Sequence, residues 1–434
     1  MPSIRVITLG CSKNTVDTEH LLAQLPEDEW IVQSENDVSP VDWLLINTCG
    51  FIGDAKQESI DAILAQAERK RSGEAGHLLV FGCLSQRYAG DLPALIPEVD
   101  GWFGARDLDP VLKAIGVEPR AELRTLRRPV EEHPSYAFLK ISEGCDRRCS
   151  YCAIPFIRGA HRSVPMEDLV REAYGLAARG VRELILIAQD TTYYGLDLYG
   201  RRCLGELLRR LSDVDGIEWL RIHYSYPADF PDDVLEQMAH NPKVCKYLDI
   251  PLQHISDKVL SAMRRGVDGA WTRELIRRLR ERVPGVVLRT TMIVGHPGEG
   301  PEEFEELLDF VREARFERLG AFTYSEEEGT YGARNFTDDV PSEEKQRRLD
   351  ALMAVQAEIS RSFNESRVGT RCRVLADDTA DGRLVCRSQY ESPEVDGEII
   401  VCCPSGTDMH SLVGKFADVR ITAADDYDLA AVLE

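Results

Sequence analysis

Short apolar runs that alternate with amphipathic stretches are the feature that most limits how this sequence can fold. The alternation runs through the first 115 or so residues and starts again near Tyr136. Alternating strands and helices favour a parallel sheet covered by helices, so each series predicts an α/β domain. At 434 residues the chain is too long for one hydrophobic core, and we expect two or three domains.

The first series predicts a small parallel α/β domain over residues 1–117. Its strands are expected at Ile4–Leu9, Val41–Ile46 and Leu78–Phe81, and its helices at Thr15–Leu25, Ala55–Arg69 and Leu92–Ile96. The following stretch, Gly116–Pro134, is rich in charge and proline and has no strong apolar period. We interpret this stretch as a linker.

The second series, residues 131–365, predicts an incomplete (β/α)6 barrel. Its six strands are expected at Ala137–Ile141, Glu183–Ala188, Trp219–Tyr224, Tyr247–Ile250, Val286–Val294 and Leu319–Tyr324. A long helical pattern from Ser342 then leads into residues 366–434, where four short apolar runs are broken by Gly, Asp and Pro. These runs predict a small antiparallel β-barrel.

Charge and cysteine content narrow the possible functions. The chain has 52 Lys and Arg against 74 Asp and Glu, which gives a net charge of −22. This charge argues against non-specific electrostatic binding to the phosphates of nucleic acid. No segment approaches the roughly 20 apolar residues that span a membrane, so we expect a cytoplasmic protein with no membrane partner. In a reducing cytoplasm, 12 cysteines indicate metal ligands, reactive thiols or buried thiols in preference to disulfides.

The strongest motif is the CxxxCxxC segment Gly144–Cys152, directly after the first strand of the predicted barrel. Its cysteines, Cys145, Cys149 and Cys152, are called the loop cysteines below. Three thiolates on one short loop can bind three irons of a four-iron cluster and leave the fourth iron open to a small molecule. Zinc is the alternative, although structural zinc sites usually have four ligands and no fourth Cys or His lies nearby in sequence.

A second group, the strand-end cysteines, consists of Cys11, Cys49 and Cys83. Each follows an apolar strand and has a glycine beside it. Because the carboxyl ends of parallel strands meet at one edge of a sheet, the three thiols can converge there on a second cluster. Adjacent glycines let the backbone approach such a cluster. The alternative is that these cysteines are buried in the core.

The remaining cysteines share no such context, and we interpret them as ordinary packed thiols. They are Cys203, Cys245, Cys372, Cys386, Cys402 and Cys403.

The CxxxCxxC loop at the start of a (β/α) barrel resembles the radical S-adenosylmethionine (SAM) superfamily. The strand-end cysteines and the terminal β-barrel make the whole chain similar to its methylthiotransferases. Further motifs that carry the resemblance are Thr8–Asn14, Asn47–Ile52, Ile141–Cys145, Asp249–His254 and Ile293–Glu299. Within that family the chain looks most like the branch that methylthiolates the β-carbon of an aspartate in ribosomal protein S12.

The resemblance implies two 4Fe–4S clusters and SAM as cofactors. The loop cysteines would hold the radical SAM cluster, at which one electron cleaves SAM to methionine and a 5′-deoxyadenosyl radical. That radical would abstract the unactivated hydrogen, so the cofactor carries the hard step and no side chain is expected as acid or base. The strand-end cysteines would hold an auxiliary cluster that handles the sulfur, and a second SAM would supply the methyl group.

The resemblance also implies an electron donor such as flavodoxin or ferredoxin and a set of SAM contacts. The expected contacts are Tyr151, Gln189, Gly295 and Glu299. Polar residues at strand ends often cap helices or shape turns, and this remains the alternative interpretation of these positions.

The terminal barrel takes the position of a TRAM domain, which in the transfer RNA members of this family helps to grip RNA. Residues 366–434 contain seven Lys and Arg against 13 Asp and Glu, and three aromatic residues. RNA-binding barrels need a basic face with aromatic platforms, so we expect this domain to dock basic ribosomal protein S12 and not transfer RNA. Two alternative functions stay open: a transfer RNA adenosine methylthiotransferase, and a non-catalytic iron–sulfur electron-transfer or carrier protein. The acidic surface also has an alternative explanation, namely that the whole proteome is acidic.

Overall fold

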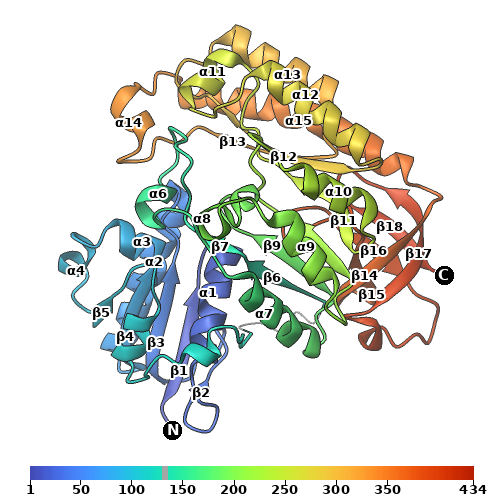
Figure 1. The fold of residues 1–434 in the computed structure, drawn as a ribbon. Coiled ribbons are helices and arrows are strands. Elements are labelled where there is room, and N and C mark those ends of the chain that lie inside the picture. The colour runs from blue at the N-terminus through green and yellow to red at the C-terminus, as the bar shows by residue number, and fades with distance from the viewer. Residues whose placement is uncertain (130–134) are drawn as a thin grey trace.

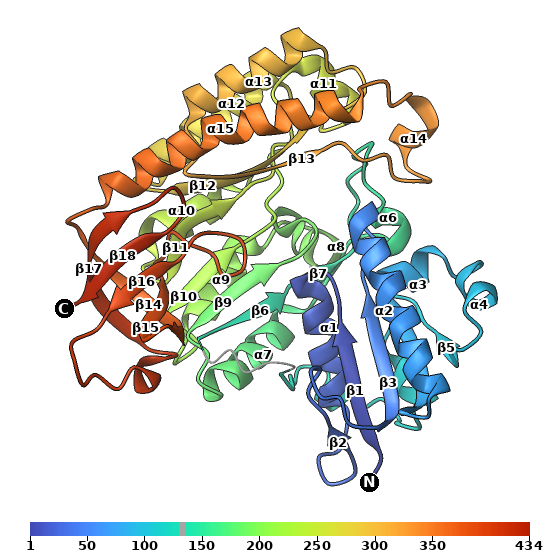
Figure 2. The same cartoon turned by 180° about the vertical axis from the view of Figure 1, so that it is seen from behind.

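The computed structural model describes residues 1–129 and 135–434, which form three parts in chain order (Figures 1 and 2). The N-terminal part is blue in Figure 1, the middle part runs from green to orange, and the C-terminal part is red. The middle part lies between the other two and contacts both.

The N-terminal part is a parallel sheet with helices on both faces, in strand order β2-β1-β3-β4-β5. Its strands are β1 (Ser3–Thr8), β2 (Ile31–Val32), β3 (Val41–Thr48), β4 (Ala75–Gly82) and β5 (Gly101–Trp102). Its helices are α1 (Ser12–Ala23), α2 (Gly53–Arg71), α3 (Cys83–Arg87), α4 (Leu92–Leu95) and α5 (Asp109–Ala114). Leu21 of α1 packs on one face and Ile63 of α2 on the other, so the strands are buried on both sides.

The middle part is an open six-stranded sheet in the order β13-β12-β11-β10-β9-β6, with every pair parallel. Its strands are β6 (Tyr136–Lys140), β9 (Glu183–Ile187), β10 (Trp219–Ile222), β11 (Val244–Asp249), β12 (Val287–Val294) and β13 (Arg318–Thr323). Two short strands, β7 (Ser142–Glu143) and β8 (Arg162–Ser163), pair beside it. The predicted incomplete barrel is therefore confirmed.

Helices cover the outer face of this curved sheet (Figures 1 and 2). The long ones are α7 (Met166–Ala178), α9 (Leu204–Ser212), α10 (Asp232–His240), α12 (Gly269–Arg282), α13 (Pro301–Ala314) and α15 (Ser342–Ser366). The short ones are α6 (Ile154–Ile157), α8 (Leu196–Tyr199), α11 (Asp257–Ala262) and α14 (Tyr331–Asn335). Among the described residues, we find no helix both long and apolar enough to cross a membrane.

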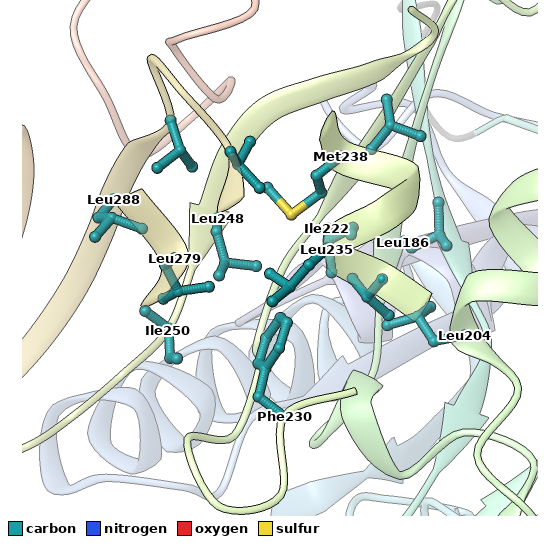
Figure 3. Close-up of a cluster of buried hydrophobic side chains, with 14 of the residues drawn as sticks. Leu186, Leu204, Ile222, Phe230, Leu235, Met238, Leu248, Ile250, Leu279 and Leu288 are labelled. Carbon is teal, nitrogen blue, oxygen red and sulfur yellow. The ribbon is translucent and has the colours of Figure 1, made fainter. Parts of the chain in front are cut away.

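The core of the middle part lies between the sheet and these helices. Figure 3 shows Ile222 and Leu248 of the strands among Leu204, Leu235 and Met238 of the helices. In α9 the buried leucines follow a spacing of three or four residues, which gives the helix one apolar stripe against the sheet.

The C-terminal part is a closed barrel in the order β14-β15-β16-β18-β17. Its strands are β14 (Arg371–Ala380), β15 (Arg383–Arg387), β16 (Ile399–Cys402), β17 (Phe416–Ala424) and β18 (Leu429–Leu433). The sequence did not predict β18, and β18 runs parallel to β16, so the barrel is mainly but not purely antiparallel. Alternate residues such as Val374, Leu384 and Ile421 fill its interior.

Buried ion pairs attach this barrel to the amino-terminal ends of the middle strands. Glu183, the first residue of β9, accepts hydrogen bonds from Arg221 at 2.6 Å and from Arg387 at 2.8 Å. Burial alone would raise the pKa of Glu183, yet these two guanidinium groups hold it below its usual value. A similar contact joins Glu391 of the C-terminal part to Arg318 at 3.0 Å.

The stretch interpreted as a linker is anchored at its described residues. Arg127 is buried, donates to the carbonyl oxygen of Phe138 at 2.9 Å, and forms ion pairs with Glu19 of α1 and Glu172 of α7. Residues 130–134, and with them the predicted start of the second domain at 131, lie outside the described residues. The domain borders at 117, 131 and 366 stay predictions.

We expect Glu183→Gln to destabilise the protein by about 3 kcal/mol, because it removes the carboxylate that pairs with the buried Arg221 and one of the two carboxylates that pair with the buried Arg387. The control is Glu274→Gln, which breaks an exposed pair with Arg277 and should leave the stability nearly unchanged. Thermal unfolding followed by circular dichroism compares the two variants. Equal melting temperatures would contradict a stabilising role for the Glu183 contacts.

Candidate functional site

The two groups of cysteines lie at the carboxyl ends of strands in two different sheets. The loop cysteines follow β6 and β7, and the strand-end cysteines follow β1, β3 and β4. The two edges meet where Cys83 and Ala105 of the N-terminal part pack against Ala153 and Ile157 at α6. Figure 1 shows α6 beside α3, which begins at Cys83.

A tight backbone shapes the loop that carries the loop cysteines. Gly144 has a φ of +78°, and a Cβ atom there would lie 2.1 Å from the carbonyl oxygen of Ala160, so the position requires glycine. The N–H of Cys145 donates to the carbonyl oxygen of Gly159 at 3.0 Å. The segment after α6 therefore fixes the start of the loop.

Two nitrogen donors face the thiols of the loop. The N–H of Arg147 points to the sulfur of Cys145, and Nη1 of the buried Arg265 points to the sulfur of Cys149, each at 3.4 Å. Burial raises the pKa of Cys145 to about 12. Since iron binds the thiolate, cluster binding must replace these protons, and nearby N–H donors and positive charge favour that exchange.

The strand-end cysteines converge at the edge of the N-terminal sheet. Gly10 has a φ of +96°, and a Cβ atom there would lie 3.0 Å from the sulfur of Cys49, so the backbone before Cys11 runs directly beside that thiol. Burial raises the pKa of Cys83 to about 11, and the neighbouring thiols of Cys11 and Cys49 add to this rise. A Cβ atom at Gly50, next to Cys49, would lie 2.9 Å from the carbonyl carbon of Cys83, so the backbone segments that carry the three thiols lie side by side.

The donor chemistry of both groups suits an iron–sulfur cluster. Within residues 1–129 and 135–434, no three His, Cys, Asp or Glu side chains gather closely enough to hold a single metal ion. A four-iron cluster makes a different demand, because each thiolate binds its own iron and the ligands stand further apart. All 12 cysteines are free thiols, and thiolates favour Fe–S clusters among the metals of the cell.

Two of the expected SAM contacts lie near the loop cysteines with polar atoms in defined positions. The hydroxyl oxygen of Tyr151 accepts a hydrogen bond from Arg265 at 3.3 Å. Gln189 follows the end of β9, and its Nε2 donates to Glu143 at 2.9 Å. The buried Oε1 of Gln189 has no hydrogen-bond partner in the described part of the chain and remains able to accept one from a ligand.

The other two expected contacts stabilise the turn after β12. The N–H of Gly295 donates to one carboxylate oxygen of Glu299 at 2.8 Å, and Arg348 donates to the other at 2.8 Å. A Cβ atom at Gly295 would lie 2.4 Å from Cγ of Lys345, so glycine is needed for α15 to approach. Contact of these four residues with SAM stays a prediction.

Comparison with known proteins finds three families along the chain. The radical SAM superfamily matches residues 139–311, the uncharacterized protein family UPF0004 matches 3–104, and the TRAM domain matches 368–433. A Porphyromonas gingivalis protein named ribosomal protein uS12 methylthiotransferase RimO is 52% identical, over 99% of this chain and 98% of its own. The protein of that name from Cytophaga hutchinsonii is 49% identical, over 98% and 96%. The chain belongs to the RimO family.

Solved structures share the fold of this RimO-family chain at low sequence identity. The radical SAM methyltransferase TsrM from Kitasatospora setae, with cobalamin and a 4Fe-4S cluster bound, has a TM-score of 0.55 and 15% identity, over 88% of this chain and 80% of that chain. The cobalamin-dependent SAM radical enzyme OxsB has a TM-score of 0.53 and 12% identity, over 82% and 56%. At these identities the likeness concerns the fold alone.

The family matches divide the two groups of cysteines between them. The radical SAM match contains the three loop cysteines, and the UPF0004 match contains the three strand-end cysteines. As a radical SAM protein, this RimO-family chain uses an iron–sulfur cluster and SAM.

Sequence reasoning missed the charged residues around the thiols. Arg147 lies inside the CxxxCxxC segment and could have been singled out there. Arg158 and Arg265 stand among 52 basic residues with no local pattern that marks them. The interpretation of the remaining cysteines as packed thiols agrees with Cys203, Cys245 and Cys386, which are buried. It is wrong for Cys402, which is exposed.

Proposed function

We propose that this RimO-family protein is a radical SAM methylthiotransferase that adds a methylthio group to the β-carbon of an aspartate of ribosomal protein uS12. SAM would serve as radical source and methyl donor. The observation that carries the proposal is the meeting of two three-cysteine groups at facing sheet edges, through Cys83 and α6. Near 50% identity to proteins named as uS12 methylthiotransferases over almost the whole chain supports the substrate.

The loop cysteines would hold one 4Fe–4S cluster and the strand-end cysteines a second. When bound, the first cluster and SAM supply radical chemistry that can break an unactivated C–H bond, which side chains of ordinary pKa cannot do. The chain's part is to position these groups. An electron donor such as flavodoxin or ferredoxin would complete the system.

The residues proposed to bind SAM act mainly by orientation. Glu143 holds the amide of Gln189, which leaves the free Oε1 to accept a hydrogen bond from the ligand. Tyr151 lies between two loop cysteines with its hydroxyl fixed by Arg265. Gly295 and Glu299 would shape the turn after β12.

We propose that the C-terminal barrel docks the substrate. Its acidic residues differ in their availability, because Asp377 is bound by Arg387 at β15 and by Ser135 at 2.6 Å. Asp378 and Asp381 are exposed. Those two residues, and not Asp377, are therefore the ones to test for attraction of a basic protein.

The cluster proposal predicts iron content. Anaerobically reconstituted protein should contain about eight irons per chain, and replacement of all three loop cysteines by Ala should leave about four. The same triple variant should lose reductive cleavage of SAM. Iron analysis and chromatography of 5′-deoxyadenosine measure both. A parent protein that binds zinc and no iron would contradict the proposed function.

The two groups of cysteines should have separable roles. Cys11→Ala, Cys49→Ala or Cys83→Ala should still allow 5′-deoxyadenosine formation, because the loop group is intact, but should abolish methylthiolated product. Mass spectrometry of uS12 together with nucleoside analysis gives both readouts. Loss of both activities to the same degree would instead indicate that the strand-end cysteines are only structural.

Substrate choice is tested with the full chain and two candidate acceptors. Purified uS12 should become methylthiolated and transfer RNA should not. Binding of uS12 should weaken as salt shortens the Debye length from about 10 Å to 3 Å, and weaken further in Asp378→Lys/Asp381→Lys. SAM cleavage without substrate should be unchanged in that variant. Modification of transfer RNA in preference to uS12 would reverse the assignment.

A further inference from the structure

Arg158 connects the two groups of cysteines. It caps the end of α6, six residues after Cys152, and only 4% of its surface is exposed. Its Nε–H donates a hydrogen bond to the sulfur of Cys83 at 3.2 Å. A residue from the segment that follows the loop cysteines therefore holds a thiol of the strand-end group.

The other nitrogens of Arg158 are fixed by buried acceptors. Nη1 donates to Asp17 of α1 at 2.8 Å and to Glu143 of β7 at 2.9 Å, and Nη2 donates to Oδ1 of Asn14 at 2.5 Å. A guanidinium group is planar, so fixing Nη1 and Nη2 also fixes the direction of Nε–H. That direction ends at the sulfur of Cys83.

The charges around Arg158 balance without a contribution from sulfur. Lys140 forms ion pairs with Asp17 and Glu143, so two cations face two carboxylates in one buried network. Such a network satisfies buried charges that would otherwise be costly. The bond to Cys83 is thus a directed N–H contact made by a group that the network already holds in place.

Hydrogen bonds to ligand sulfurs change the reduction potential of a cluster. The reduced cluster carries one more negative charge, so an N–H donor at a ligand sulfur stabilises the reduced state more than the oxidised state. Glu143, which holds Nη1 of Arg158, also holds Gln189 at 2.9 Å. One carboxylate therefore fixes both Arg158, which bonds to Cys83, and Gln189, which follows β9.

We propose that Arg158 is a positioning residue for the strand-end cluster: it fixes Cys83 and raises the reduction potential of the cluster through its Nε–H bond. This proposal rests on the second cluster of the proposed function. In this role Arg158 acts on the cluster through Cys83, which is the cluster's ligand, and does not contact the substrate.

The test uses the full chain with all three loop cysteines replaced by Ala, so that the strand-end cluster is the only one bound. In this background Arg158→Gln removes both the planar guanidinium group and its positive charge. Arg158→Lys removes the guanidinium group but keeps a positive charge. The matched control is Arg106→Gln, because Arg106 donates to the carbonyl oxygens of Phe156 and Ile157 in the same segment. Iron content and the midpoint potential from a dithionite titration are measured for each.

We expect about four irons per chain in all variants and a more negative midpoint potential for Arg158→Gln than for the parent. Arg158→Lys should show a smaller shift in the same direction, and Arg106→Gln should match the parent. If Arg158→Gln fails to fold or to bind iron, Arg158→Lys decides. An unchanged midpoint in the variant that retains its cluster would overturn the role of Arg158 and leave the second cluster standing. A parent without iron would overturn the second cluster itself, and Arg158 with it.

Discussion

Parallel strand pairing is the constraint on which the rest of this structure depends. When all strands of a sheet point the same way, every carboxyl end lies at one edge, and residues distant in sequence meet there. The N-terminal sheet brings together Cys11, Cys49 and Cys83 in this way, and the middle sheet places its cysteine loop at the corresponding edge. Because the two edges face each other, a site of six thiols needs no long insertion from either part.

Joining two such edges requires charged groups to be buried together. Lys140 and Arg158 come from the middle part and Asp17 from the N-terminal part, so this network forms only when the two parts are packed. Removing one member would leave an uncompensated charge, which costs more than the whole network contributes. The network therefore favours one relative placement of the two edges, and with it one spacing between the two groups of cysteines.

Local patterns predicted the elements, and long-range contacts lay beyond them. The fold class and the longer strands of both large sheets could be predicted because buried parallel strands are continuous apolar runs, such as Leu184–Ile187, whereas the two-residue strands β2 and β5 were not predicted. β18 escaped notice because its five residues are all apolar and show no alternation, although it pairs with β17 directly before it as well as with β16. Arg158 could not be predicted either, because its partners Asn14 and Cys83 lie 144 and 75 residues away.

The position of the C-terminal barrel limits what kind of substrate can bind to the barrel and at the same time reach the cysteine site. Arg387 and Glu391 of the C-terminal part contact Glu183 and Arg318, the first residues of β9 and β13, and Ser392 reaches His223, directly after β10, at 2.8 Å. The cysteine loop follows the last residues of β6 and β7. At about 3.3 Å per residue, a five-residue strand such as β6 separates these ends by roughly 17 Å. A free amino acid cannot span that distance. A folded protein can rest on the acidic barrel and still present one side chain to the site, which suits the proposed docking of a ribosomal protein on this barrel.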